Sequence, residues 1–150
     1  MSGRIIEIIE NLSSVIEGIE IEADCDPSRP FRRLLGANNI RSEHAPNADR
    51  AFTVNLLRGS KLADFGLQNR TENLFTLEIT VCYLQRADRA SQEKILSSDI
   101  EKIMLALEKP ENAGKATLVT VRGFAIDRAS AHYIYATFEV SVRYGLSTEI

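Results

Sequence analysis

Residues 75–83 have the sequence FTLEITVCY, in which apolar and polar side chains alternate without interruption. Successive side chains of a β-strand point to opposite faces of its sheet, so this period of two gives the strand one apolar face. The apolar row consists of Phe75, Leu77, Ile79, Val81 and Tyr83. The stretch therefore predicts a strand that lays one face against a hydrophobic core and turns a polar face away from it.

Three other segments predict strands, at about residues 50–58, 116–126 and 132–144. The last of them repeats the alternation most clearly, with an apolar row of Ile134, Ala136, Phe138, Val140, Val142 and Tyr144. Strands that follow each other in sequence tend to be neighbours in a sheet. We therefore expect two antiparallel hairpins, one from the first two strands and one from the last two.

Two amphipathic segments, residues 2–18 and 91–108, predict helices. Apolar residues of the first recur at the helical spacing of three and four, and they are Ile5, Ile9, Leu12 and Ile16. Ser91 is the predicted N-cap of the second helix. The apolar face of that helix comprises Ile95, Ile100, Ile103, Met104 and Leu107. The stripe of the first helix is broad, so we expect it to contact the sheet on one side and a partner chain on the other.

The element order helix, strand, strand, helix, strand, strand predicts an α+β fold. The expected architecture is a two-layer sandwich, with a four-stranded, mainly antiparallel sheet covered on one face by two helices. Residues 1–150 are expected to form a single domain. The uncovered face is predicted to meet water or the lumen of an assembly, and its side chains are Thr76, Glu78, Thr80, Glu139, Ser141 and Arg143.

Two stretches follow neither period. Residues 20–50 contain Pro27, Pro30 and Pro46, and predict an irregular arm that is locally basic through Arg29, Arg32, Arg33 and Arg41. The arm is either a solvated loop or a segment that becomes ordered against a neighbouring subunit, since long irregular stretches in a domain are usually functional or mobile. Residues 59–73 are polar and contain glycine and asparagine, and predict a long hairpin loop.

Composition excludes some classes of protein. The hydrophobic fraction of 44% and the charged fraction of 26% are typical of a globular chain and exclude global disorder. A net charge of −3 disfavours sequence-specific binding to duplex DNA, which normally needs a basic excess. Cys25 and Cys82 form no CxxC motif and predict reduced thiols in a cytosolic protein. No apolar run approaches the roughly 18 residues of a membrane span, and the carboxylates of Glu7 and Glu10 argue against a signal peptide.

The sequence offers no constellation for catalysis. The two histidines, His44 and His132, have no partner at metal-ligand spacing, so neither a metal nor another cofactor is expected. Residues 97–99, Ser-Ser-Asp, resemble no nucleophile elbow and are interpreted as ordinary polar residues of a helix. No glycine-rich loop is followed by the lysine and hydroxyl of a phosphate site. We therefore expect a protein that is not an enzyme.

Three segments together resemble a known family. They are LEITVCY at 77–83, DIEKIMLAL at 99–107 and FEVSVRY at 138–144. A strand ending in an aromatic residue, a helix with a leading aspartate and a closing strand ending in Arg-Tyr are similar to the tail-terminator, or tail-completion, proteins of long-tailed phages. The chain also resembles them in length and element order, and the resemblance covers roughly residues 50–146.

The resemblance implies a virion protein that is made in the host cytoplasm. It would form a ring of itself, typically a homohexamer, on the last ring of the tail tube protein. The ring would stop polymerisation of the tube and offer a docking surface to the head–neck connector proteins. DNA would pass through its lumen without specific recognition, and no membrane would be involved.

The resemblance also suggests three groups of interface residues. In the arm they are Arg29, Phe31, Arg32 and Arg33. In the hairpin loop, which is expected to reach a neighbouring ring, they are Lys61, Asp64, Phe65, Gln68 and Arg70. On the uncovered sheet face they are Tyr133, Glu139 and Arg143. Phe65 is the strongest single candidate, because aromatic residues are common at interface centres.

Other functions stay open at this point. The chain could be a different neck or tail component, such as a head–tail joining protein or a tube subunit. It could be a small-molecule-binding domain or an enzyme with a pocket built from scattered residues. It could also be an RNA-binding sheet, which displays stacking aromatics on its open face. Here only Tyr133 and Tyr135 are predicted on that face, because Phe75, Tyr83 and Phe138 are assigned to the core.

Overall fold

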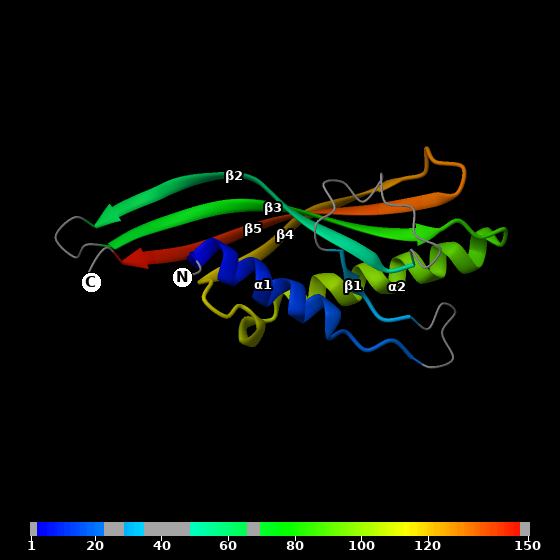
Figure 1. Ribbon diagram of the computed structural model, residues 1–150, viewed down its shortest axis with the longest axis horizontal. Coiled ribbons are helices and arrows are strands. Elements are labelled where there is room, and N and C mark those ends of the chain that lie inside the picture. Colours follow the sequence, from blue (N-terminus) through cyan, green and yellow to red (C-terminus); the bar gives the residue numbers. More distant parts are fainter. Residues whose placement is uncertain (1–2, 23–28, 35–48, 66–69, 148–150) are drawn as a thin grey trace.

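The protein is an α+β domain with one mixed five-stranded sheet and two helices, as seen in a computed structural model (Figure 1). The structure describes residues 3–22, 29–34, 49–65 and 70–147. Its elements in chain order are α1 (Arg4–Glu17), β1 (Arg32–Arg33), β2 (Ala51–Phe65), β3 (Arg70–Leu84), α2 (Arg89–Glu108), the 3-10 helix η3 (Pro110–Asn112), β4 (Leu118–Asp127) and β5 (Tyr133–Ser147). The predicted α+β class is confirmed.

The strands lie in the spatial order β1-β2-β3-β5-β4. Neighbouring strands are antiparallel except for the parallel pair β1 and β2. The two predicted hairpins, β2–β3 and β4–β5, are confirmed. The prediction of four strands is wrong, because Arg32 and Arg33 pair with Ala51 and Phe52 and add a fifth. A strand of two residues is too short to produce an alternation that sequence analysis could detect.

The predicted hairpin loop at residues 59–73 is also wrong. β2 continues to Phe65 and β3 begins at Arg70, so the two strands pair across most of this stretch. The register of β2 shifts between Leu56 and Arg58 and again between Lys61 and Ala63. Each shift inserts one extra residue, as in a β-bulge, and thereby breaks the alternation that marks a strand in the sequence. The resulting three-stranded end of β2, β3 and β5 extends past the start of α1 (Figure 1).

Both helices cover the same face of the sheet, so the two-layer arrangement is as expected (Figure 1). The predicted apolar rows of β3 and β5 are buried in the main core. In α1 the fully buried apolar residues are Ile8, Leu12 and Ile16, whereas Ile5 and Ile9 are only partly buried. The buried stripe is therefore rotated relative to the prediction, toward Ile8 and away from Ile9. The apolar face of α2 is buried as predicted, except that Met104 is only partly buried.

The start of α2 differs from the prediction. Its N-cap is Asp88 rather than Ser91, and the helix begins at Arg89. The Asp88 carboxylate accepts hydrogen bonds from the backbone N–H of Ala90 at 3.1 Å and from the Ser91 hydroxyl at 2.7 Å. These hydrogen bonds, with Ser91 contributing most, lower the pKa of Asp88 below its ordinary value. Aspartate caps a helix by accepting from the N–H groups of its first turn, which have no partner within the helix.

The opposite face of the sheet is less open than its sequence suggests. Ala51, Cys82 and Tyr135 form a second, small buried cluster there, with Leu34 and Tyr133 packed against it. The prediction that Tyr135 lies on an open face is therefore wrong. Four polar side chains on this face are also buried, and they are Thr53, Thr76, Thr80 and Ser141.

Candidate functional site

The exposed apolar side chains gather on two strands that lie at or near opposite edges of the sheet. Of the eight large apolar side chains that are exposed in the described part of the chain, five lie on β2 or β4. They are 45–54% exposed, and they are Leu56, Leu57, Leu62, Leu118 and Phe124. Single exposed leucines are ordinary, but a concentration on particular strands points to a contact surface.

The outer edge of β2 is covered only at its start. β1 pairs with Ala51 and Phe52, and among the residues that the structure describes no other strand pairs with this edge. The rest of the strand, from Thr53 to Phe65, includes both bulges and the exposed leucines. Uncovered backbone N–H and C=O groups of such an edge can pair with another strand.

β4 forms the other edge of the sheet and pairs only with β5 among the described strands. Its register shifts between Val121 and Gly123, so Arg122 is the extra residue of a bulge. The backbone N–H of Val121 donates a hydrogen bond of 3.0 Å to Oε2 of Glu108, the last residue of α2. One N–H of this edge is thus covered by a side chain of the same chain.

Charged residues on the uncovered face are paired with each other. Arg58 Nη2 lies 2.8 Å from Glu139 Oε1, and Arg143 Nε lies 3.9 Å from Glu72 Oε1. Arg122 donates from Nε to the Ser141 hydroxyl at 3.1 Å, which helps to explain why Ser141 is buried. Exposed pairs of this kind contribute little stability, but they balance positive and negative charge across the face.

The predicted interface residues are distributed over several parts of the fold. Tyr133, Glu139 and Arg143 alternate along β5 and lie on the face away from the helices, as predicted. Lys61 and Asp64 lie in β2 rather than in a loop. Phe65 and Arg70 are the paired ends of β2 and β3. Gln68 lies outside the described residues. The structure therefore places the backbone of this group at the extended end of the sheet.

Residues 29–34 of the predicted arm pack on their own chain. The backbone N–H of Arg32 donates to the carbonyl of Arg50 at 3.0 Å, and that of Leu34 donates to Phe52 at 2.8 Å. Arg33 Nη1 lies 3.2 Å from Glu10 Oε2 of α1. Phe31 is buried in the main core, so it cannot contact a neighbouring subunit in this conformation. The remainder of the arm, residues 23–28 and 35–48, lies outside the described residues.

The buried side chain of Arg50 contacts residues 29–34 from the core. Its side chain is fully buried, and its Nη1 donates to the carbonyl of Arg29 at 3.0 Å. Its guanidinium lies 5.6 Å from the centre of the Phe31 ring. Arg50 also adopts a left-handed backbone conformation with φ of 61°, which costs a residue with a side chain about 1–2 kcal/mol. The contacts of its side chain with Asp99, Arg29 and Phe31 hold Arg50 in this conformation.

Asp99 is the main partner of Arg50. The prediction that Asp99 is an ordinary polar residue of the helix is wrong, because its side chain is buried and also accepts a 2.8 Å hydrogen bond from the Tyr83 hydroxyl. Burial, followed by the negative charge of Asp99, raises the pKa of Tyr83 well above its ordinary value. The cluster joins the start of β2, the end of β3 and the middle of α2.

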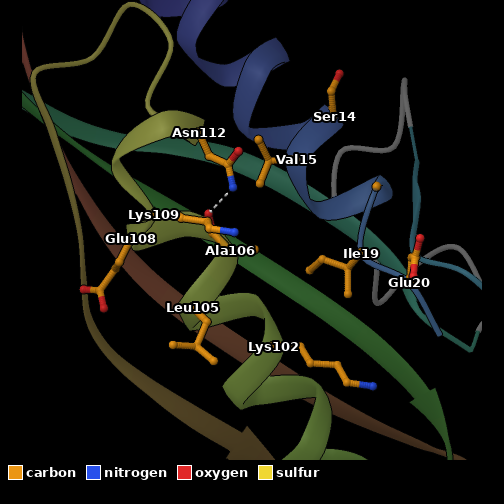
Figure 2. A pocket seen from close by; sticks show the side chains of 11 residues that line it. Ser14, Val15, Ile19, Glu20, Lys102, Leu105, Ala106, Glu108, Lys109 and Asn112 are labelled. Carbon is orange, nitrogen blue, oxygen red and sulfur yellow. Dashed lines mark hydrogen bonds between the residues drawn. The ribbon is translucent and has the colours of Figure 1, made fainter. Parts of the chain in front are cut away.

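A groove of about 850 Å³ separates the C-terminal halves of α1 and α2. Val15 and Ile19 line one wall and Leu105 and Ala106 the other, with Lys102 at the rim (Figure 2). Leu105 is 74% exposed, more than any other large apolar residue that the structure describes. The uncovered sheet face has a smaller hollow of about 310 Å³, bounded by leucines and by Arg122 and Arg143.

The described residues contain no group of three or more His, Cys, Asp or Glu side chains that could hold a metal ion. None of the described helices is both long and apolar enough to cross a bilayer.

No family model matches the chain, and no curated protein matches it. The resemblance to tail-terminator proteins therefore stays a prediction.

The exposed apolar residues at the sheet edges were not predicted from the sequence as interface residues. Leu57 and Leu62 fall at the two bulges of β2, where the alternation fails, and Leu118 begins β4. The signal that could have identified Leu62 is an apolar residue inside a polar stretch. Leu62 shares this feature with Phe65.

Proposed function

We propose that the protein is a structural, non-enzymatic virion component that forms a closed ring of identical copies at the end of a phage tail tube. The observation that supports this function best is the gathering of exposed apolar side chains on β2 and β4. The ring would stop polymerisation of the tube and present a surface to the head–neck connector proteins. The sequence resemblance supplies the biological context of the proposal.

The two edge strands differ, and a contact between them is of the kind that a ring requires. Contact between the outer edge of β2 in one copy and the outer edge of β4 in the next would be heterologous, which means that two different surfaces of the same protein meet. Heterologous contacts generate closed rings or open filaments, depending on the rotation between copies. Beyond the two residues that pair with β1, the stretch Thr53–Phe65 of β2 is long enough to pair with all ten residues of β4. Such pairing would bring Leu57 and Leu62 close to Leu118 and Phe124.

The uncovered sheet face fits the lumen of such a ring. Two of its arginines, Arg58 and Arg143, each lie beside a glutamate, which offsets part of the positive charge with which the face could hold a phosphate backbone. Binding of duplex DNA depends on phosphate neutralisation by unpaired cations. DNA could therefore pass this face without being gripped.

The test is the size of the protein in solution, measured by light scattering coupled to gel filtration across a concentration series, with and without tail tubes. A discrete oligomer, or a monomer that forms rings when tubes are added, supports the proposal. Growth into long tubes would instead identify a tube subunit. A strict monomer that ignores tubes would refute the ring.

A further inference from the structure

A glutamate side chain of the same chain covers part of the β4 edge. The Glu108 carboxylate accepts the hydrogen bond of the outward N–H of Val121 at 3.0 Å. Val121 faces Val140 in the β4–β5 ladder, yet its N–H points away from β5 and toward α2. An outward N–H of an edge strand is one of the groups through which an added strand would pair. Glu108 therefore occupies a position that a second strand needs.

The position of Glu108 is unfavourable for the helix that carries it. It is the last residue of α2, and the last turn of this helix contains no basic residue. The C-terminal end of a helix carries a partial negative charge, so a carboxylate there is repelled rather than stabilised. Helix stability thus gives no reason for a glutamate at this position, whereas the contact with β4 does.

The hydrogen bond between Glu108 and the Val121 N–H is exposed to solvent and covers a single point of the β4 edge. Glu108 is exposed, and its carboxylate reaches the strand edge through this hydrogen bond. In Figure 2 its side chain lies on the side of α2 that faces away from Ile19 and Lys102. Rotation of the side chain into water would uncover the Val121 N–H without moving α2. The bulge at Arg122 directly follows and is a second feature that hinders pairing at this point.

We infer that Glu108 is an autoinhibitory guard of the β4 edge, which must be displaced before the outer edge of β2 in a second copy can pair there. This inference rests on the proposed ring. It explains how one chain could carry two exposed edges and still avoid uncontrolled association before it meets a tail tube. Proteins commonly protect edge strands with charged side chains and bulges, and here the protection is reversible.

The experiment compares self-association of the wild type with three variants by light scattering across a concentration series. Glu108→Ala removes the cover and is expected to raise the apparent association constant roughly tenfold, the scale of a hydrogen bond to a charged group. Glu108→Gln keeps an acceptor oxygen and is expected to stay near the wild type. Glu111→Ala removes a nearby exposed carboxylate that lies 3.5 Å from Lys109, and so controls for net charge.

The outcomes separate this inference from the proposed function. Stronger association of Glu108→Ala than of both other variants supports the guard. Equal association of all four proteins, with rings still formed on tail tubes, overturns the guard and leaves the ring intact. Absence of association in every protein, with tubes present, overturns both.

Discussion

The guanidinium of Arg50 and the carboxylate of Asp99 form a buried, two-point ion pair. Nε donates to Oδ2 at 2.7 Å and Nη2 donates to Oδ1 at 3.1 Å, and the two side chains are 0% and 1% exposed. The pair connects the start of β2 to the middle of α2. Because Arg50 also binds the Arg29 carbonyl, it joins the helix layer, the sheet and the segment 29–34.

Replacing Asp99 with alanine is expected to destabilise the protein by about 3–5 kcal/mol, because Arg50 would remain buried without its partner charge. Urea unfolding followed by circular dichroism measures the change. Glu101→Ala is the matched control, since Glu101 is an exposed carboxylate of the same helix, and the expected change is within about 0.5 kcal/mol. A loss below about 1 kcal/mol for Asp99→Ala would show that the pair contributes little.

Tyr83 gives the protein an alkaline limit of stability. Its pKa is raised in the folded state above the ordinary value of 10.0, first by burial and then by the charge of Asp99. Between the ordinary and the raised pKa the unfolded chain loses the tyrosine proton and the folded chain keeps it. Stability is therefore expected to fall as the pH rises above the ordinary pKa.

The measurement is thermal unfolding at a series of pH values from neutral upward. Tyr83→Phe removes the titrating hydroxyl, so this variant is expected to lose part of the alkaline decline and to lose some stability at neutral pH. Tyr133→Phe, on the other sheet face, is expected to keep the decline of the wild type. If Tyr83→Phe and the wild type have the same alkaline slope, Tyr83 does not cause it.

The fold was predictable where one period continues through a whole element. The alternation from Phe75 to Tyr83 and from Ile134 to Tyr144 is unbroken, and both strands lie where it predicts. The outer half of β2 was not predictable, because the bulges at Leu57 and Leu62 shift the pattern. The roles of Arg50 and Asp99 depend on a contact between residues 49 positions apart, for which no local pattern exists.

The candidate site was harder to predict than the fold. The resemblance suggests Phe31 as an interface residue of the arm, yet it is buried beside Arg50. The edge surfaces arise from strand order, in which β4 follows β5 at the outside of the sheet. A single sequence gives hairpins from adjacent strands, but it does not give the order in which two hairpins join.

The proposed ring predicts the effect of charge on the β4 edge. The double variant Leu118→Lys with Phe124→Lys is expected to weaken self-association or ring formation on tail tubes at least tenfold, because lysine on an edge strand opposes pairing. Both side chains are about half exposed, so the melting temperature should change little. Light scattering and thermal unfolding measure the two quantities.

Leu105→Lys is the control for this variant. Leu105 is the most exposed of the large apolar residues described, and it lies in the groove between the helices. Its replacement is expected to leave association unchanged. If Leu105→Lys weakens association and the β4 variant does not, the copies meet through the helices and the edge-to-edge ring is wrong.

The connection between α2 and β4 depends on one glycine. Gly114 has φ of +59°, in the left-handed region, and a Cβ at this position would lie 2.6 Å from Nδ2 of Asn11. That amide donates a 2.8 Å hydrogen bond to the carbonyl of Asn112 and so ties the connection to α1. Gly114→Ala would strain the backbone and push Asn11 away from this bond. The expected loss of stability is about 1–3 kcal/mol.

Gly123→Ala provides the comparison within the same part of the chain. Nothing lies within 4 Å of a Cβ at Gly123, and its φ is outside the left-handed region. Alanine there restricts the unfolded chain without strain in the folded one, so stability is expected to stay equal or to rise by up to about 1 kcal/mol. Urea unfolding of both variants measures the two changes in the free energy of unfolding. Equal losses at the two positions would mean that neither the left-handed backbone nor the nearby Asn11 side chain makes Gly114 sensitive to substitution.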